Sequence, residues 1–270
     1  MDQSVQAIGS FLLNHRYFPA FEEWIIKEKI EVTDRLLDLL HLRESYLKGD
    51  LDRVKKRAAD LGFSFLVAPS FLEQRVYRCV QAMELKLRSG AYDDYLRQLT
   101  PLLVDIFRLL VQEHILADLD RYLIEVFKET VEGRSIYRGI RWNQDQIESH
   151  PNLVQATFNK YYGEYFNYDH YLSSSHLMKI IEANSQDRHI VDLAKAMRQI
   201  EKYTRNIVAH ELIHVDDAWL LHRIGKNSSE IHHDLVKLAN KAGLKDMKQW
   251  QGLKLIEKAI RQEYQLGFNK

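Results

Sequence analysis

Apolar residues recur every three to four positions along most of the 270-residue chain, which is the spacing of residues on one face of a helix. Four prolines and eleven glycines leave long stretches free of residues that break helices. Several of the helical stretches are followed by a glycine that can end a helix. They cover residues 11–30, 32–50, 51–62, 70–90, 100–133, 171–184, 186–225, 228–243 and 247–267. The sequence therefore predicts an all-α fold, built as a multi-helix bundle.

A few stretches depart from this helical pattern. The segment 100–133 is expected to contain one break, near Ala117 and Asp118. FSFLVA at 63–68 is the one stretch typical of a strand. GRSIYRGIRW and the residues after it lack a helical period and contain two glycines, which indicates a linker or hairpin. We therefore expect an N-terminal helical region at 1–132, a linker or hairpin at 133–150, and a C-terminal helical region at 151–270 that carries the function.

Composition adds little about partners. Apolar residues make up 46% of the chain and charged residues 28%, and 38 basic residues balance 38 acidic ones, so only a local basic surface could indicate nucleic-acid binding. The single cysteine, Cys79, excludes an internal disulfide and is expected to be a small buried residue. The N-terminal residues do not resemble a signal peptide, and no apolar run is long enough to span a bilayer. We expect a soluble, cytoplasmic protein without membrane contact.

The stretch 205–214, RNIVAHELIH, matches two catalytic patterns that share one histidine. HELIH is the H-E-x-x-H signature of zinc peptidases, in which His210 and His214 would bind the metal from one helix face and Glu211 would activate water. The extended signature fails, because Asp217 and Leu220 stand where a glycine and a third histidine are needed. Glu230 is a candidate third ligand on a following helix, and the zinc peptidase stays an alternative.

The second pattern uses Arg205, Asn206 and His210 and needs neither a metal nor a cofactor. A histidine can take or give a proton near neutral pH. An arginine can bind a phosphate and the charge that develops on its oxygens, and an asparagine can donate a further hydrogen bond. These are the groups that cleavage of RNA by its own 2′-hydroxyl requires. One helix supplies one such set, so a site with both an acid and a base implies two copies across a two-fold axis, that is, a homodimer.

An all-α chain with R-N-x-x-A-H late in its sequence resembles the HEPN ribonuclease superfamily, and most closely the ancillary ribonucleases of type III CRISPR systems. The resemblance implies a HEPN-like C-terminal half, with Arg205, Asn206 and His210 as catalytic residues at a two-fold dimer interface. It also implies metal-independent cleavage of single-stranded RNA to a 2′,3′-cyclic phosphate, in CRISPR or other antiviral defence. Those ribonucleases usually carry a CARF sensor domain, and no β-α-β pattern is present here. Cyclic oligoadenylate is therefore expected as a partner only if a sensor domain is present elsewhere.

Other readings stay open. The chain could be a catalytically silent helical interaction module, or one component of a toxin–antitoxin pair. His214 and Glu211 could line the site without acting in it. The segment from Arg134 to Trp142 interleaves arginines with aromatic residues, as a groove for single-stranded RNA does. HHD at 232–234 is a weaker candidate for the His-Asp pair of helical metal-dependent phosphohydrolases. Three basic residues on the last helix are a weaker candidate for a surface that faces RNA, namely Lys254, Lys258 and Arg261.

Overall fold

The computed structural model describes residues 3–211 and 213–268. Helices make up most of these residues, which confirms the predicted all-α architecture. Contacts group the chain into two compact units: residues up to Ala82 together with those from Asp246 onward form unit 1, and Met83–Lys245 form unit 2. These units divide the chain at other positions than 132 and 150, so the three functional regions expected from the sequence stay a prediction.

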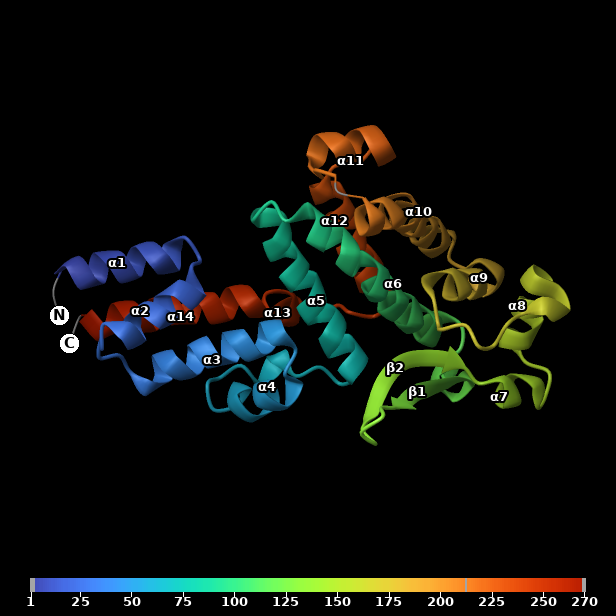
Figure 1. Ribbon diagram of the computed structural model, residues 1–270, viewed down its shortest axis with the longest axis horizontal. Coiled ribbons are helices and arrows are strands. Elements are labelled where there is room, and N and C mark those ends of the chain that lie inside the picture. Colours follow the sequence, from blue (N-terminus) through green and yellow to red (C-terminus); the bar gives the residue numbers. More distant parts are fainter. Residues whose placement is uncertain (1–2, 212, 269–270) are drawn as a thin grey trace. The chain divides into compact units, whose positions relative to one another are not determined.

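Unit 1 brings the two ends of the sequence into one helical bundle. Helix α14 (Gly252–Phe268) packs against α3 (Asp34–Lys48) and α1 (Gln3–Asn14), as Figure 1 shows. Leu39 and Leu42 of α3 and Ile256 and Ile260 of α14 are fully buried between these helices. The other elements of the unit are α2 (Phe18–Lys27), α4 (Leu51–Ala58), the 3₁₀ turn η1 (Ser64–Leu66), the first part of α5 (Phe71–Arg88) and α13 (Met247–Trp250).

Local signals explain several of these boundaries. Thr33 caps α3 by accepting a hydrogen bond from the backbone N–H of Leu36 (3.2 Å). Gly49 ends the helix in the left-handed conformation (φ 76°), as expected of a glycine at the end of a helical stretch. The strand expected at 63–68 is wrong. Gly62 and Pro69 confine this stretch, and Leu66 closes a 3₁₀ turn through the carbonyl of Phe63 (2.9 Å) instead of pairing with another strand.

A buried ion cluster joins α14 to the rest of unit 1. The carboxylate of Glu257 is fully buried and accepts hydrogen bonds from the guanidinium groups of Arg16 and Arg43. The guanidinium of Arg43 also lies 4.0 Å from the ring centroid of Phe18. Burial lowers the pKa of Arg43, and the neighbouring Glu257 carboxylate opposes that shift. The charges in this part of the core are thus paired with one another.

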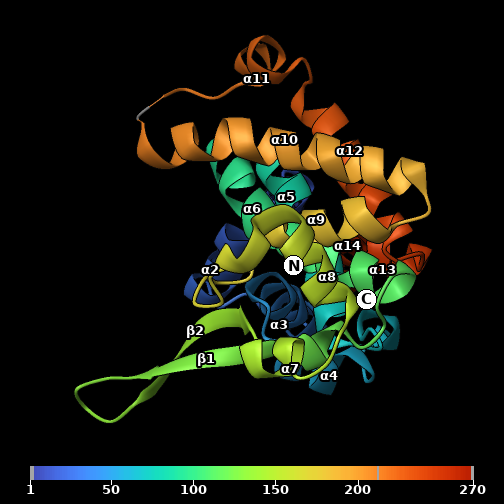
Figure 2. The same ribbon diagram turned by 90° about the vertical axis from the view of Figure 1, so that its right-hand side faces the viewer.

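Unit 2 is built around α6 (Tyr92–His114), which contacts α9 (Ser174–Asn184), α10 (Arg188–His210) and α12 (Ser228–Lys241). In Figure 2, α10 runs across the unit with α9 below it and α11 (Asp217–Ile224) above it. The 3₁₀ turn η2 (Leu119–Tyr122) follows α6, while α7 (Gln144–Glu148), α8 (Leu153–Tyr162) and the 3₁₀ turn η3 (Gly163–Tyr165) precede α9. Among the described residues, no helix is both long and apolar enough to cross a membrane.

An antiparallel hairpin interrupts the helices of unit 2. Its strands are β1 (Leu123–Glu129) and β2 (Ser135–Trp142), and it projects away from the helices in Figure 2. The expectation of a helix through 123–129 is wrong. This stretch contains two β-branched residues and a phenylalanine, and one edge of it pairs with β2. The hairpin expected within 133–150 therefore exists, but its first strand lies upstream of that range.

Candidate active site

Helix α10 carries the three candidate catalytic residues, and its buried face holds it in place. Asp187 caps its first turn by accepting hydrogen bonds from the backbone N–H groups of His189 (2.8 Å) and Ile190 (3.3 Å). From there a buried stripe follows the helical period as far as the last turn, and it includes Ile190, Ala194, Met197, Thr204 and Val208. The opposite faces of α10 are therefore available to solvent.

Arg205 and His210 are both exposed, in the last two turns of α10. They are five positions apart in the sequence, which on a straight helix places their Cα–Cβ directions about 140° apart. The long arginine side chain can reach part of the way around the helix toward His210. The backbone of Asn206 belongs to α10, but its side chain lies outside the described residues.

The helix ends at His210, which corrects the sequence interpretation of HELIH. Glu211 is extended (φ −119°, ψ 143°), and its N–H closes the last turn on the carbonyl of Ile207 (2.8 Å). His214 follows outside the helix with an almost fully exposed side chain, 3.9 Å from a carboxylate oxygen of Asp216. His210 and His214 therefore do not share a helix face, and the prediction that they do is wrong. Leu212 lies outside the described residues.

Glu230, the expected third zinc ligand, forms hydrogen bonds at the start of α12 instead. Glu230 accepts a hydrogen bond from the N–H of Asn227 (2.8 Å), while the Asn227 side chain accepts one from the N–H of Glu230 (2.9 Å). This reciprocal pair is a capping box at the start of α12. The structure thus gives the H-E-x-x-H reading neither its helix nor its expected third ligand.

Two arginines from other helices hold the end of α10. Arg97 of α6 donates to the carbonyl of Val208 (3.2 Å), one of the carbonyls that a helix terminus leaves without an intrahelical partner. Arg223 of α11 donates to the carbonyl of Tyr203 (3.3 Å). Positive charge at the C-terminal end of a helix is favourable because the helix dipole is negative there. Sequence reasoning missed both residues, since neither has a local pattern that connects it to α10.

The family comparison covers this region. A family model described as the Cas_Csm6 HEPN domain matches residues 65–261, which is most of the chain and includes Arg205 and His210. The chain belongs to the Csm6 HEPN domain family. No curated protein matches it.

A solved structure supports the same fold. The Csm6 of Enterococcus italicus, bound to cyclic hexa-2′-fluoro-hexa-dAMP, superposes with a TM-score of 0.60 at 14% sequence identity, covering 96% of this chain and 57% of that one. The chain thus spans little more than half the length of that Csm6. The resemblance to the ribonucleases of type III CRISPR systems, inferred from R-N-x-x-A-H, is confirmed at the level of the family.

Several side chains of the segment from Arg134 to Trp142, which the sequence suggests as an RNA groove, make structural contacts in this Csm6-type chain. In β2, Trp142 is buried and donates to Nδ1 of His176 (3.1 Å), while the Arg141 guanidinium lies 4.9 Å from the ring centroid of Tyr171 and 3.4 Å from Asp169. Other side chains of the segment are exposed, namely Arg134, Tyr137 and Arg138. Cys79, expected to be buried, is half-buried and contacts Arg78.

On α12, Asp234 of the HHD triplet forms an ion pair with Lys226. In the part of the chain that the structure describes, no group of three or more His, Cys, Asp or Glu side chains could hold a metal ion. Of the basic residues on α14, Arg261 donates to the carbonyl of Leu13 (3.1 Å), whereas Lys254 and Lys258 are exposed.

Proposed function

We propose that this chain is an endoribonuclease that cuts single-stranded RNA without a metal ion, in CRISPR or other antiviral defence. One observation carries the proposal: Arg205 and His210 are exposed together at the end of α10, inside the region matched by the Csm6 HEPN model. Asn206, between them in the motif, is proposed as a hydrogen-bond donor to the substrate.

The chemistry uses the substrate's own nucleophile. A histidine removes the proton of the 2′-hydroxyl while its oxygen attacks the adjacent phosphorus, and the bond from phosphorus to the 5′-oxygen breaks. An acid returns a proton to the leaving 5′-oxygen, so the products are a 2′,3′-cyclic phosphate and a free 5′-hydroxyl. The guanidinium of Arg205 would bind the non-bridging oxygens, on which negative charge increases in the transition state.

A single chain offers one His210, but the reaction needs both a base and an acid. We therefore propose a homodimer in which two α10 ends meet and the second copy provides the other histidine. The exposure of the α10 end supports this arrangement, because it leaves Arg205 and His210 accessible to another copy and to RNA. The Enterococcus protein is bound to cyclic hexa-2′-fluoro-hexa-dAMP. For this chain we propose binding of cyclic oligoadenylate only as part of a longer protein with a sensor domain.

The test is cleavage of a labelled single-stranded RNA by the full chain in the presence of EDTA, with analysis of the 3′ ends. We expect His210→Ala to reduce kcat by about 10²–10⁴-fold, the usual contribution of an acid or base. Arg205→Ala should cost about 10²–10³-fold, as the loss of one transition-state donor does. His214→Ala is the matched control, because this histidine lies four residues further on, outside the helix, and should leave most activity.

Three outcomes would contradict the proposal. If His214→Ala abolishes activity while Arg205→Ala is harmless, the histidines act in another chemistry. If the purified chain cuts no RNA in any condition and yet dimerises, it is an interaction module rather than a nuclease. A 3′ end that lacks the cyclic phosphate, together with loss of activity in EDTA, would exclude attack by the 2′-hydroxyl.

A further inference from the structure

A groove follows α10 on the surface of unit 2. It consists of two adjoining hollows of about 320 Å³ and about 450 Å³, which share Ala196 of α10 and Lys226 of the loop after α11. The first hollow lies between α10 and α11 and ends at Tyr203 and Arg223. The second lies between α10 and α12 and reaches Lys237. Because the hollows share two lining residues, they adjoin each other along α10, and we refer to them together as the groove.

The groove is aligned with His210. The α10 residues that face it include Asp192, Ala196, Gln199 and Tyr203, at spacings of three and four. At 100° per residue, the Cα–Cβ directions of these four residues fall within about 40° of that of His210, while those of the other α10 residues that line the groove, His189, Leu193 and Ile200, lie about 60–100° from it. Along the axis, Asp192 lies about 27 Å and Tyr203 about 10 Å before His210. A ligand lying in the groove would therefore continue along the same helix face to the histidine.

The walls of the groove carry more positive than negative charge. Arg223, Lys226, Lys237 and Lys241 line it, against the carboxylates of Asp192 and Asp234. Two of the lysines are already paired, Lys226 with Asp234 and Lys241 with Asp187. Lys237 is exposed and has no ion-pair partner among the described residues, and Arg223 uses one N–H on the carbonyl of Tyr203. The groove thus has cationic donors left for an anionic ligand.

Tyr203 adds an aromatic surface at the end nearest the candidate active site. Its side chain is 50% exposed although the groove floor beside it, from Ala196 and Ile200, is apolar. The ammonium of Lys202 lies 5.9 Å from its ring centroid, so a cation is already beside the ring. Exposed aromatic rings next to basic side chains are the features with which proteins hold single strands, by stacking on bases and by contact with phosphates.

From this geometry we propose that the groove binds the substrate RNA strand on one side of the scissile phosphate. Tyr203 stacks on a base, and Arg223 and Lys237 bind phosphates. The inference rests on the proposed ribonuclease function and adds to it the path of the strand. Double-stranded RNA does not fit this arrangement, because its bases are stacked within the duplex and are not available to Tyr203.

The experiment measures KM and kcat of the full chain on labelled single-stranded RNA, and binding of the same RNA to variants in the His210→Ala background. We expect Tyr203→Ala to weaken binding about 5- to 100-fold, the range for loss of one stacked base, with a corresponding rise in KM. Tyr203→Phe keeps the ring and should restore binding. Lys237→Glu should weaken it about 3- to 10-fold, and more at low salt.

The matched control is Lys56→Glu, which makes the same charge change in a hollow of unit 1. We expect it to leave RNA binding within twofold. Photocrosslinking with 4-thiouridine in the RNA gives an independent readout, and the crosslinked peptide should come from the α10 segment around Tyr203.

The two proposals fail in different ways. If His210→Ala abolishes cleavage but Tyr203→Ala and Lys237→Glu leave KM and RNA binding unchanged, the groove proposal is wrong and the nuclease stands. If the groove variants lose binding of a polyglutamate peptide and not of RNA, the groove takes an acidic protein segment instead. If His210→Ala cleaves RNA normally, the proposed function itself is wrong.

Discussion

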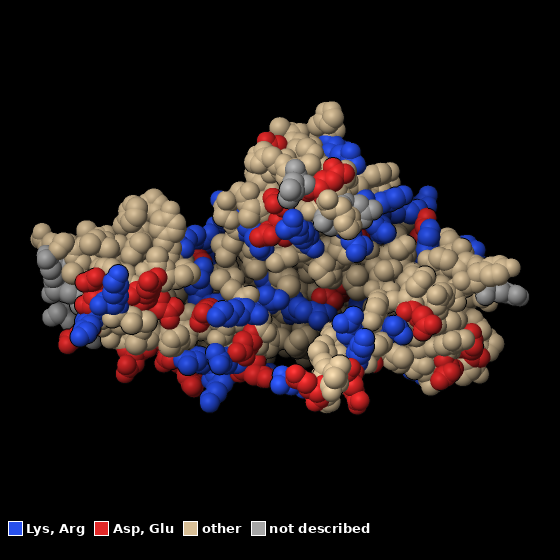
Figure 3. Space-filling view, viewed as in Figure 1, with Lys and Arg blue, Asp and Glu red and all other residues tan. Residues whose placement is uncertain are grey.

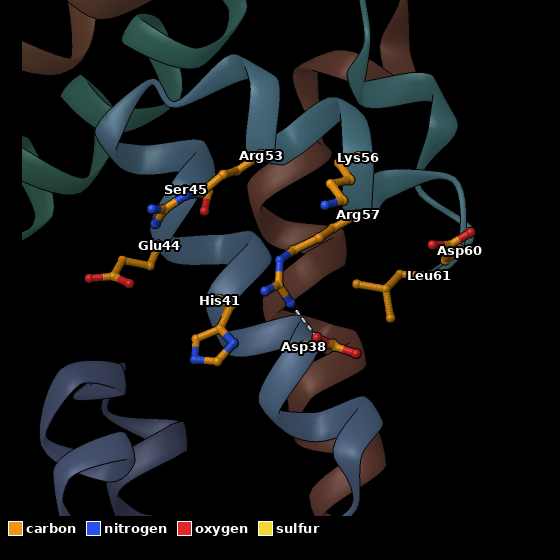
Figure 4. Close-up of a pocket in the computed structure, with 9 residues that line it drawn as sticks. All are labelled: Asp38, His41, Glu44, Ser45, Arg53, Lys56, Arg57, Asp60 and Leu61. Carbon is orange, nitrogen blue, oxygen red and sulfur yellow. Dashed lines mark hydrogen bonds and ion pairs between the residues drawn. The ribbon is translucent and has the colours of Figure 1, made fainter.

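Each unit of the chain carries a polar hollow between helices, and the two hollows differ in how many of their charged side chains are paired. The hollow of unit 1, of about 700 Å³, lies between α3 and α4 and is lined by both signs of charge, as Figure 4 shows. Arg57 is paired there with Asp38, and Arg53 with Asp50 beside it. The groove of unit 2 is divided into smaller hollows, yet it leaves Lys237 unpaired among the described residues and is aligned with His210.

The difference shows that volume alone does not indicate function. Three basic and three acidic residues line the unit 1 hollow, so its charges satisfy one another and attract no ion strongly. Over both units, Lys and Arg are interspersed with Asp and Glu on the face seen in Figure 3, in keeping with the zero net charge. What distinguishes the groove is a local excess of positive charge in line with a catalytic candidate. The charges of unit 1 should therefore govern stability, and those of the groove should govern RNA binding.

The largest effect is expected from the buried charge of unit 1. Replacing Glu257 with alanine leaves Arg16 and Arg43 without their buried carboxylate, and breaking a buried ion pair in this way costs about 3–5 kcal/mol of unfolding free energy. Urea unfolding followed by circular dichroism measures the change. Glu44→Ala is the control, because Glu44 is half-exposed and its pair with Lys48 is worth about 0.5 kcal/mol. Equal effects of the two substitutions would remove the distinction between buried and exposed charge in unit 1.

The helices themselves could be predicted from the sequence because their signals are local. Apolar spacing, the cap at Thr33 and the stop at Gly49 define α3. In α10, the buried residues Val191, Ala194, Met197 and Ile200 follow the same spacing of three to four positions. Strand β1 could not be predicted, because its short apolar run suits a helix as well as a strand. Pairing with β2, on the other side of the turn, decides between them.

The sequence identifies candidate residues for the site, and their catalytic role stays a prediction. The motif identifies Arg205 and His210, but no glycine or proline in the sequence marks the end of α10 at His210. Packing supplies the reason: Val215 is buried, and Asp216 caps α11 through the N–H of Trp219 (2.7 Å), so the chain must leave the helix before them. The groove depends on α11 and α12 lying beside α10, which no local pattern in the sequence specifies.

A second, smaller stability effect comes from a buried ionisable group in unit 2. His176 lies among aromatic rings and accepts a hydrogen bond from Trp142, and its burial, with a minor contribution from His170, lowers its pKa from 6.5 to about 4. The unfolded chain therefore binds this proton more readily between these values. The stabilisation is complete above pH 6.5 and is lost as the pH falls toward 4.

The variant His176→Gln should flatten this part of the pH dependence, because glutamine can still accept from Trp142 but does not titrate. The measurement is the urea midpoint at several pH values between 4 and 7.5, compared with the parent chain. His222→Gln removes an exposed histidine of α11 and should leave the slope as it was. We expect a smaller effect than that of Glu257→Ala, because His176 is not fully buried. Parallel curves for parent and His176→Gln would show that this histidine does not contribute to the acid sensitivity.

The smallest effect concerns the groove and compares the two hollows directly. Each phosphate contact releases counterions, so affinity for a single strand falls with salt, with a slope of about 0.7 in log K against log salt per contact. Lys237→Gln should lower that slope by about 0.7, so the loss of affinity should be about two- to threefold larger at about 50 mM salt than at about 200 mM salt. Lys56→Gln in the unit 1 hollow should leave the slope unchanged, because the charges there balance without RNA. An equal change in slope for both lysines would mean that RNA affinity depends only on the net charge of the chain. The proposed difference between the balanced hollow of unit 1 and the binding groove of unit 2 would then be wrong.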